Sequence, residues 1–197
     1  MPQYFDNPAG LKDEQGMLSF TLAGHDYTLE TNAGVFSKDK LDEGSRILLQ
    51  TMLEHQEKPE NLLDLGCGIG PIGVVLGSSW KCPVTGIDVN QRACQLAQLN
   101  YRRYQVAGKV ICQDGIREGS FACIALNPPI RAGKSVIYRL FEEAADHLQA
   151  DGSLWIVIRR SHGAESALRK LNELGLKTER VSRDKGFWVL RAIKEKI

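Results

Sequence analysis

Residues 62–73 read LLDLGCGIGPIG and carry the strongest local signal in the sequence. A short apolar run leads into Gly66, Gly68 and Gly70, which let the backbone turn sharply and approach a ligand without Cβ clashes. Pro71 suits the first turn of a helix, and the start of a helix offers free N–H groups to polar ligand atoms. The stretch therefore predicts a buried strand, a ligand-binding turn and a helix.

Downstream of this turn, short apolar strands alternate with amphipathic helices. Such alternation predicts an α/β domain with a mostly parallel sheet, whose ligands bind outside the carboxyl ends of the strands. Gly152 suits the end of the helix expected at 135–149. Strands are expected at 61–66, 82–88, 109–114, 121–127, 153–159 and 186–192, and helices at 91–101, 135–149 and 164–174.

Upstream of the turn the pattern changes. MLSFTLA and DYTLET flank Gly24 and His25, which predicts a β-hairpin. A helix is expected from about Asp42 to His55, where apolar residues recur near one face. We expect a single domain over the whole chain, with an N-terminal hairpin and helix followed by a Rossmann-like core, at residues 1–58 and 59–197.

The composition is that of an ordinary globular domain, with 43% hydrophobic and 25% charged residues. No apolar run approaches the roughly 18 residues of a membrane span, and the N-terminal MPQYFDNPAG does not resemble a secretory signal. The five cysteines form no C-x-x-C pair, and the four histidines show no ligand spacing. We therefore expect a cytoplasmic protein with reduced thiols, no metal and no membrane partner.

The glycine-rich turn also fits a dinucleotide fingerprint. Gly68, Gly70 and Gly73 form G-x-G-x-x-G, and Asp88 lies 20 residues past the first of them. An NAD-dependent oxidoreductase is therefore an alternative. Asp64 argues against it, because an acid inside the strand is poorly placed beside a pyrophosphate. It suits a ligand with an ammonium group, such as S-adenosylmethionine.

Acids lie at or near the ends of three successive predicted strands, at Asp64, Asp88 and Asp114. A carboxylate at Asp88 can accept both hydroxyls of a ribose, and one at Asp114 can accept the amino group of an adenine. Each acid alone is explained as a helix cap or a solvated strand end. The three together, after one glycine-rich turn, favour a nucleoside ligand.

The strand at 121–127 ends in Asn127, which Pro128 and Pro129 follow. The prolines fix φ and remove two donors, so the Asn127 amide and the nearby carbonyls are held as rigid acceptors. Such acceptors can bind the hydrogens of an exocyclic amine and point its lone pair at a methyl donor. A capped strand end with a proline loop is the alternative.

In this order, DLGCGIG, GIDVN and NPPI resemble the class I S-adenosylmethionine-dependent methyltransferases that modify conjugated nitrogens. NAGVFSKDKLDEGSRILL and NPPIRAGK are similar to the small-domain relatives of ribosomal RNA small-subunit guanine-N2 methyltransferases. The resemblance covers roughly residues 31–192 and implies a seven-stranded sheet whose last strand is antiparallel. It also implies that loop 34–37 lies over the cofactor pocket, with cofactor contacts from Asp64, Gly66, Gly68, Gly70, Asp88, Asp114 and Asn127.

The same resemblance implies that Asn127 and Pro128 are catalytic and contact the target amine, and that the residues after them bind the substrate. The Asn127 side-chain oxygen and the Pro128 carbonyl would accept the amine hydrogens and favour the developing ammonium. An aspartate at position 127 should then retain some activity, because a carboxylate also accepts hydrogen bonds. Pro129 and Ile130 come next, and Ile130 departs from the family, which often has a base-stacking aromatic ring there.

Basic residues are compatible with an RNA partner, and a solvated basic surface is the alternative. Arg131 and Lys134 follow Asn127 closely and could hold a phosphate. Residues 159–197 contain 11 basic and 5 acidic residues, within a chain whose net charge is +1. Such a basic region is compatible with a phosphate backbone, and Arg159, Arg160, Arg183 and Lys185 could extend the track.

We therefore expect an S-adenosylmethionine-dependent N-methyltransferase that modifies the exocyclic amine of a base, guanine N2, in ribosomal RNA. A protein glutamine amide is also a conjugated nitrogen, so a protein N-methyltransferase is an alternative. A non-catalytic cofactor-binding subunit is another, which the intact Asn127-Pro128-Pro129 disfavours.

Overall fold

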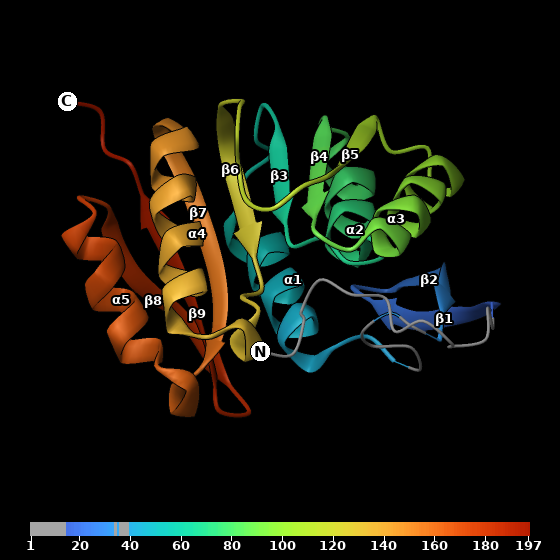
Figure 1. Ribbon diagram of the computed structural model, residues 1–197, viewed down its shortest axis with the longest axis horizontal. Helices are drawn as coiled ribbons and strands as arrows, with labels where there is room; N and C mark the ends of the chain where they lie inside the picture. The colour runs from blue at the N-terminus through green and yellow to red at the C-terminus, as the bar shows by residue number, and fades with distance from the viewer. Residues whose placement is uncertain (1–14, 34, 36–39) are drawn as a thin grey trace.

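The computed structural model describes residues 15–33, 35 and 40–197, and its centre is one seven-stranded sheet (Figure 1). The strands are β3 (Leu62–Leu65), β4 (Val84–Asp88), β5 (Gly108–Cys112), β6 (Phe121–Leu126), β7 (Leu148–Arg159), β8 (Lys177–Asp184) and β9 (Phe187–Ile193). Their order is β5-β4-β3-β6-β7-β9-β8. In this sheet β9 pairs antiparallel with both β7 and β8, and the other neighbouring strands pair in parallel, so β9 is the one reversed strand. The predicted Rossmann-like sheet with an antiparallel last strand is confirmed.

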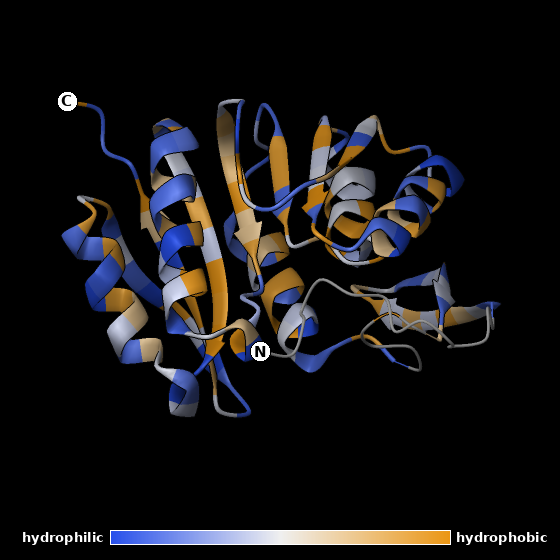
Figure 2. Ribbon diagram, in the orientation of Figure 1, coloured by the Kyte–Doolittle hydropathy of each residue, from blue (hydrophilic) through white to orange (hydrophobic). Residues whose placement is uncertain are grey.

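Helices cover both faces of the sheet: α1 (Glu43–His55), α2 (Pro71–Trp80), α3 (Gln91–Arg103), α4 (Lys134–His147) and α5 (Ala164–Glu173). Side chains of a strand alternate between faces, so Leu62 joins the core beneath α1, α2 and α3, and Leu63 joins the core beneath α4 and α5. Figure 2 shows the central strands as largely hydrophobic and the outer surfaces of the helices as hydrophilic. The result is a three-layer α/β/α sandwich.

The N-terminal hairpin, β1 (Gln15–Leu22) and β2 (His25–Asn32), forms a separate two-stranded sheet. Its turn is Ala23-Gly24 rather than Gly24-His25, because both Ala23 and Gly24 have positive φ, as a two-residue hairpin turn requires. The hairpin is bound to α3 by Asn100, whose amide accepts from Glu30 N (2.8 Å) and donates to Glu30 O (3.1 Å). The same amide nitrogen donates to Ile69 O at 2.8 Å, so Asn100 joins the hairpin to the glycine-rich turn.

Helix α1 is attached to the sheet at its C-terminal end by Gln56. The side-chain oxygen of Gln56 accepts hydrogen bonds from Trp155 Nε1 (2.9 Å) and Ser153 Oγ (2.7 Å), both on β7. Trp155 is fully buried, so its N–H needs such a partner. This contact fixes one end of the helix that borders the site described below.

The predicted helix 135–149 ends two residues too late. α4 ends at His147, and Gly152 lies within β7 rather than at a helix end. The reason is a bulge: β6 pairs Phe121 with Leu148 and then Cys123 with Ser153, so several β7 residues lie between two β6 positions. Asp151 has a positive φ there.

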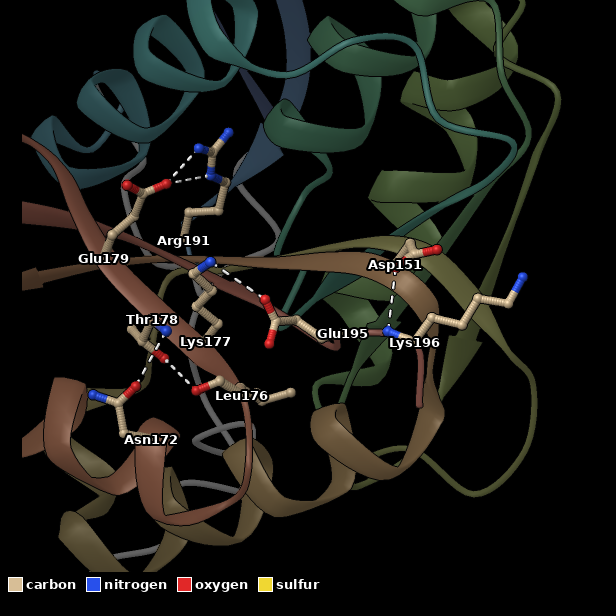
Figure 3. Close-up of polar contacts among 9 residues, drawn as sticks. All are labelled: Asp151, Asn172, Leu176, Lys177, Thr178, Glu179, Arg191, Glu195 and Lys196. Atoms are coloured by element: carbon tan, nitrogen blue, oxygen red, sulfur yellow. Dashed lines mark hydrogen bonds and ion pairs between the residues drawn. The ribbon is translucent and has the colours of Figure 1, made fainter.

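Strand β8 was not among the strands predicted from the apolar pattern. Its sequence, KTERVSRD, is largely exposed and has no apolar alternation. It is an edge strand held by polar contacts (Figure 3): Glu179 pairs with Arg191 of β9, Lys177 with Glu195 (3.3 Å), and Thr178 N donates to Asn172 Oδ1 (3.1 Å). Charged side chains are a usual feature of an exposed sheet edge.

Among the described residues, no helix is long and apolar enough to cross a membrane. No group of three or more His, Cys, Asp or Glu side chains in the same part of the chain is placed to hold a metal ion. All five cysteines are free thiols.

Candidate active site

The carboxyl ends of β3, β4 and β6 bring the predicted site residues to one edge of the sheet. Leu65 of β3 lies level with Ile87 of β4 on one side and with Leu126 of β6 on the other. The glycine-rich turn therefore lies between Asp88, which ends β4, and Asn127, which follows β6.

Two of the glycines form an open cradle. Gly66 and Gly68 have positive φ, and a Cβ on either would meet no described atom within 4 Å. Gly70 and Gly73 are crowded instead, since a Cβ there would lie 2.9 Å from Tyr101 Cε1 and 2.1 Å from Tyr101 Oη. Packing thus explains Gly73, the third glycine of the dinucleotide fingerprint. The space beside Gly66 and Gly68 is where the backbone can approach a ligand.

Asp88 clamps the turn to the end of β4. Its Oδ2 accepts from Gly68 N at 2.8 Å and its Oδ1 accepts from Asn90 N at 2.9 Å. Burial raises the pKa of this carboxyl, while backbone N–H donors of Asn90, Gly68 and Val89 act in the opposite direction. A carboxylate has about four lone-pair sites, so the predicted contact with a ribose is compatible with this geometry.

Asp64 is completely buried, and its Oδ2 accepts from Gly73 N at 3.0 Å. Burial raises its pKa to about 7. Neither Asp64 Oδ1 nor Tyr101 Oη has a hydrogen-bond partner among the described residues, and burial together with the Asp64 charge raises the Tyr101 pKa well above its usual value. Asp64 therefore holds the first turn of α2 against β3. Its predicted contact with an ammonium group stays a prediction.

Asp114 lies two residues beyond the end of β5, not at the strand end as expected. Its carboxylate is exposed and pairs with Arg139 of α4 at 2.7 Å. Arg139 also pairs with Glu143 at 2.6 Å, and Glu143 accepts from Ile116 N at 2.8 Å. This network was not foreseen from the sequence. The contact of Asp114 with an adenine stays a prediction.

Asn127 is oriented by the start of α1. Its side-chain nitrogen donates to Asp42 Oδ2 (2.8 Å) and to Ser45 Oγ (3.0 Å). A carboxylate can only accept, so these bonds decide which end of the amide is nitrogen. No described residue donates to Asn127 Oδ1, which is therefore the free acceptor of this side chain. Asp42 is also the N-cap of α1, accepting from Ser45 N at 2.9 Å.

The sequence interpretation missed Asp42 and Ser45, which lie more than 80 positions before Asn127. The sequence pattern predicts Asp42 only as the start of a helix. The signal that could have identified it was its place inside the upstream element that carried the family resemblance.

The residues after Asn127, which were predicted to bind the substrate, differ in their exposure. Pro128 is buried, Pro129 and Ile130 are half-buried, and Arg131 and Lys134 are exposed. Ile130 begins the short 3-10 helix η1 (Ile130–Ala132) and lines a cavity of about 180 Å³, together with Lys134 and residues of α4, α5 and β7.

The loop 34–37 was expected over the cofactor pocket. Of these residues the structure describes only Val35, which is buried and donates from its backbone to Asn32 O at 3.1 Å. The rest of that prediction lies outside the described residues.

Comparisons with known proteins identify the family of this chain. A family model described as the methyltransferase small domain matches residues 26–191. The chain is 40% identical to YbxB of Bacillus subtilis, over 97% of this chain and 98% of that protein. It is 30% identical to ribosomal RNA large subunit methyltransferase G of Pseudoalteromonas translucida, over 94% of this chain and 50% of that protein. The chain thus spans about half the length of that ribosomal RNA enzyme.

A solved structure shares the fold. The T. thermophilus 16S rRNA N2 G1207 methyltransferase, in complex with AdoMet and guanosine, superposes with a TM-score of 0.81 at 23% identity. The match covers 92% of this chain and 51% of that one.

Proposed function

This chain belongs to the methyltransferase small domain family. We propose that it methylates the exocyclic amine of a base in ribosomal RNA, with guanine N2 as the target. The observation that carries the proposal is Asn127, whose two amide hydrogens are taken up by Asp42 and Ser45 and whose oxygen is left to accept from an amine. The ribosomal RNA methyltransferases among its relatives support an RNA substrate, and the guanosine in the T. thermophilus structure supports the base. The match to a methyltransferase family excludes the NAD-dependent oxidoreductase alternative.

The methyl donor is S-adenosylmethionine. When bound, it supplies an electrophilic methyl group on a positively charged sulfur. The cradle at Gly66 and Gly68 fits such a ligand, because its backbone can be approached without side-chain obstruction. Asp88 would hold the ribose hydroxyls, and Asp114 the adenine amino group.

Asn127 and Pro128 act on the target amine. The lone pair of a conjugated amine is delocalised into the ring, so it is a weak nucleophile. Asn127 Oδ1 and the Pro128 carbonyl accept the two amine hydrogens, turn the lone pair outward and stabilise the developing ammonium more than the flat ground state. No strong base is required, because the methylated ammonium is acidic and releases its proton readily.

Arg131 and Lys134 bind RNA phosphates. Both are exposed, and no described acid pairs with either. The wider basic track is less available than its sequence suggests, since Arg160 pairs with Glu165 (3.3 Å) and Lys185 with Glu43 (2.7 Å). The two cations next to Asn127 are therefore the better phosphate contacts.

Label transfer tests the proposal. Purified protein is incubated with methyl-labelled S-adenosylmethionine and, in parallel, with ribosomal RNA transcribed in vitro, assembled ribosomal subunits and ribosomal proteins. We expect the label in N2-methylguanosine of the RNA. Label in a protein glutamine would establish the protein alternative instead. Cofactor binding without label in any fraction would favour the non-catalytic subunit.

A further inference from the structure

An aromatic ring borders Asn127, although Ile130 does not supply it. The ring belongs to Phe187, the first residue of β9. A Cβ built on Gly44, in the first turn of α1, would lie 3.1 Å from Phe187 Cε1 and 3.5 Å from Asn127 Nδ2. The Phe187 ring edge and the Asn127 amide therefore border the same point on α1.

The sheet register explains why Phe187 reaches this edge. Leu126 pairs with Ile156, so Asn127 is level with the last residues of β7, which ends at Arg159. Arg159 pairs with Phe187. Because β9 runs antiparallel to β7, its first residue lies at the carboxyl edge, where the active-site residues are.

Phe187 is covered by a cation instead of being sealed into the core. Its ring is half-buried, and the exposed guanidinium of Arg159 lies 4.2 Å from the ring centroid. The turn before it is tied to α1 by the Lys185–Glu43 ion pair. RNA-binding proteins stack unpaired bases on both aromatic rings and guanidinium planes. A target base must also be held flat while its amine contacts Asn127.

We propose that Phe187 and Arg159 form a stacking platform for the target base, in place of the ring that is absent at Ile130. The platform rests on the proposed function and names the group that holds the base once it has left its own stack. Arg159 contributes a planar cation that also favours the negatively charged RNA.

The next residue of β9 supplies a matched control. Trp188 has a guanidinium over its ring as well, that of Arg180 at 4.5 Å, but it packs into the core beneath α4 and α5. Phe187 packs on the α1 face. A purely structural role for aromatic–arginine pairs would make the two positions behave alike.

Steady-state methylation of in vitro transcribed ribosomal RNA tests the platform, with S-adenosylhomocysteine titration and thermal melts alongside. Phe187→Leu should lower kcat/KM for RNA roughly 5- to 100-fold, mainly through KM, as expected for a lost base stack. Its S-adenosylhomocysteine affinity should not change. Phe187→Tyr should stay near wild type, and Ile130→Phe added to Phe187→Leu should restore part of the loss. Trp188→Leu should leave KM for RNA near wild type.

Arg159→Ala keeps the test decisive if Phe187→Leu does not fold. Arg159 is exposed, so this variant should fold, and the loss of its guanidinium should also raise KM for RNA. Equal KM values in Phe187→Leu and Trp188→Leu, or an unchanged KM in a folded Arg159→Ala, would overturn the platform while wild-type RNA methylation stands. A wild-type enzyme that places no label in RNA would overturn the proposed function and the platform with it.

Discussion

The two halves of the carboxyl edge are built differently. On the cofactor side, the carboxylates of Asp64 and Asp88 accept from backbone N–H groups of the adjacent turn, and all these residues lie between positions 64 and 90. On the target side, Asn127 is oriented by side chains of α1. The proposed cofactor cradle and its two acids are therefore encoded in one short stretch, with Asp114 as the exception because it pairs with Arg139 of α4, whereas the proposed target side is assembled from distant segments. One half can therefore be altered without the other.

Loss of the Asn127 amide should separate the two halves most clearly. Asn127→Ala should lower kcat by about 10²–10³, the usual effect of removing one well-placed polar contact to a transition state. The variant should still bind S-adenosylhomocysteine, and its melting temperature should stay close to wild type. Single-turnover rates on one RNA measure the effect. A wild-type methylation rate in this variant would show that Asn127 only caps the end of β6.

The structure reverses the expectation for Asn127→Asp. The sequence alone predicts residual activity, but a carboxylate at position 127 would face the Asp42 carboxylate that now accepts from Asn127 at 2.8 Å. Like charges at this distance repel strongly. We expect Asn127→Asp to be no more active than Asn127→Ala at neutral pH, and an Asn127→Asp enzyme clearly more active than Asn127→Ala would contradict the orientation given for the amide.

On the cofactor side, Asp88→Ala should weaken S-adenosylhomocysteine binding by about 1–3 kcal/mol, the scale of charge-assisted hydrogen bonds. It also removes the clamp on Gly68, so the loss should fall in the upper part of that range. Calorimetric titration of a folded variant measures it. An unchanged affinity would remove Asp88 from the site.

Asp64 predicts a pH dependence of stability. Its pKa is about 7 in the folded protein, against an ordinary 3.8. Between these values the folded state keeps a proton that the unfolded chain releases, so this group lowers the free energy of unfolding as the pH rises from about 4 to about 7. The loss is a few kcal/mol at most, at about 1.4 kcal/mol per pKa unit.

Asp64→Asn tests this dependence, because an amide oxygen can still accept from Gly73 N but cannot ionise. Denaturant unfolding of both proteins between about pH 5 and pH 8 should show the variant gaining stability relative to wild type as the pH rises. Parallel curves would show that Asp64 does not titrate in this range.

Asp42 should affect only the target side. Asp42→Ser keeps an N-cap for α1, but its shorter side chain does not reach Asn127, so kcat should fall roughly tenfold while stability is retained. Asp42→Ala should show the same rate loss together with about 0.5–2 kcal/mol of destabilisation. Normal rates in both variants would mean that Asn127 needs no support from α1.

The smallest effect is expected from the surface cations. Arg131→Ala with Lys134→Ala should weaken RNA binding and flatten its salt dependence by up to roughly 2 units of slope, without changing cofactor affinity. Filter binding over a range of salt concentrations measures the slope. An unchanged slope would show that neither side chain contacts an RNA phosphate and that both are ordinary solvated surface residues.

The same division explains what could be predicted from the sequence. Residues 62–73 and the apolar strands predicted the sheet, because burial on both faces and a glycine-rich turn leave local patterns. Strand β8 left none, since its residues face solvent and are held by ion pairs. The orientation of Asn127 and the position of Phe187 depend on contacts between segments far apart in the chain. No spacing in the sequence reports them.

Helix α1 is attached to the sheet at both ends, by Asp42 and Ser45 to Asn127 and by Gln56 to Trp155 and Ser153. The 13-residue length of α1 therefore sets the distance between these two attachments. One inserted residue would advance the helix by about 1.5 Å and rotate it by about 100°, which would break one attachment or the other. A chimera that transplants only residues 127–130 into a methyltransferase without counterparts of Asp42 and Ser45 would carry an amide that its host does not orient. Target preference should move between such enzymes only when α1 and the start of β9 move with it.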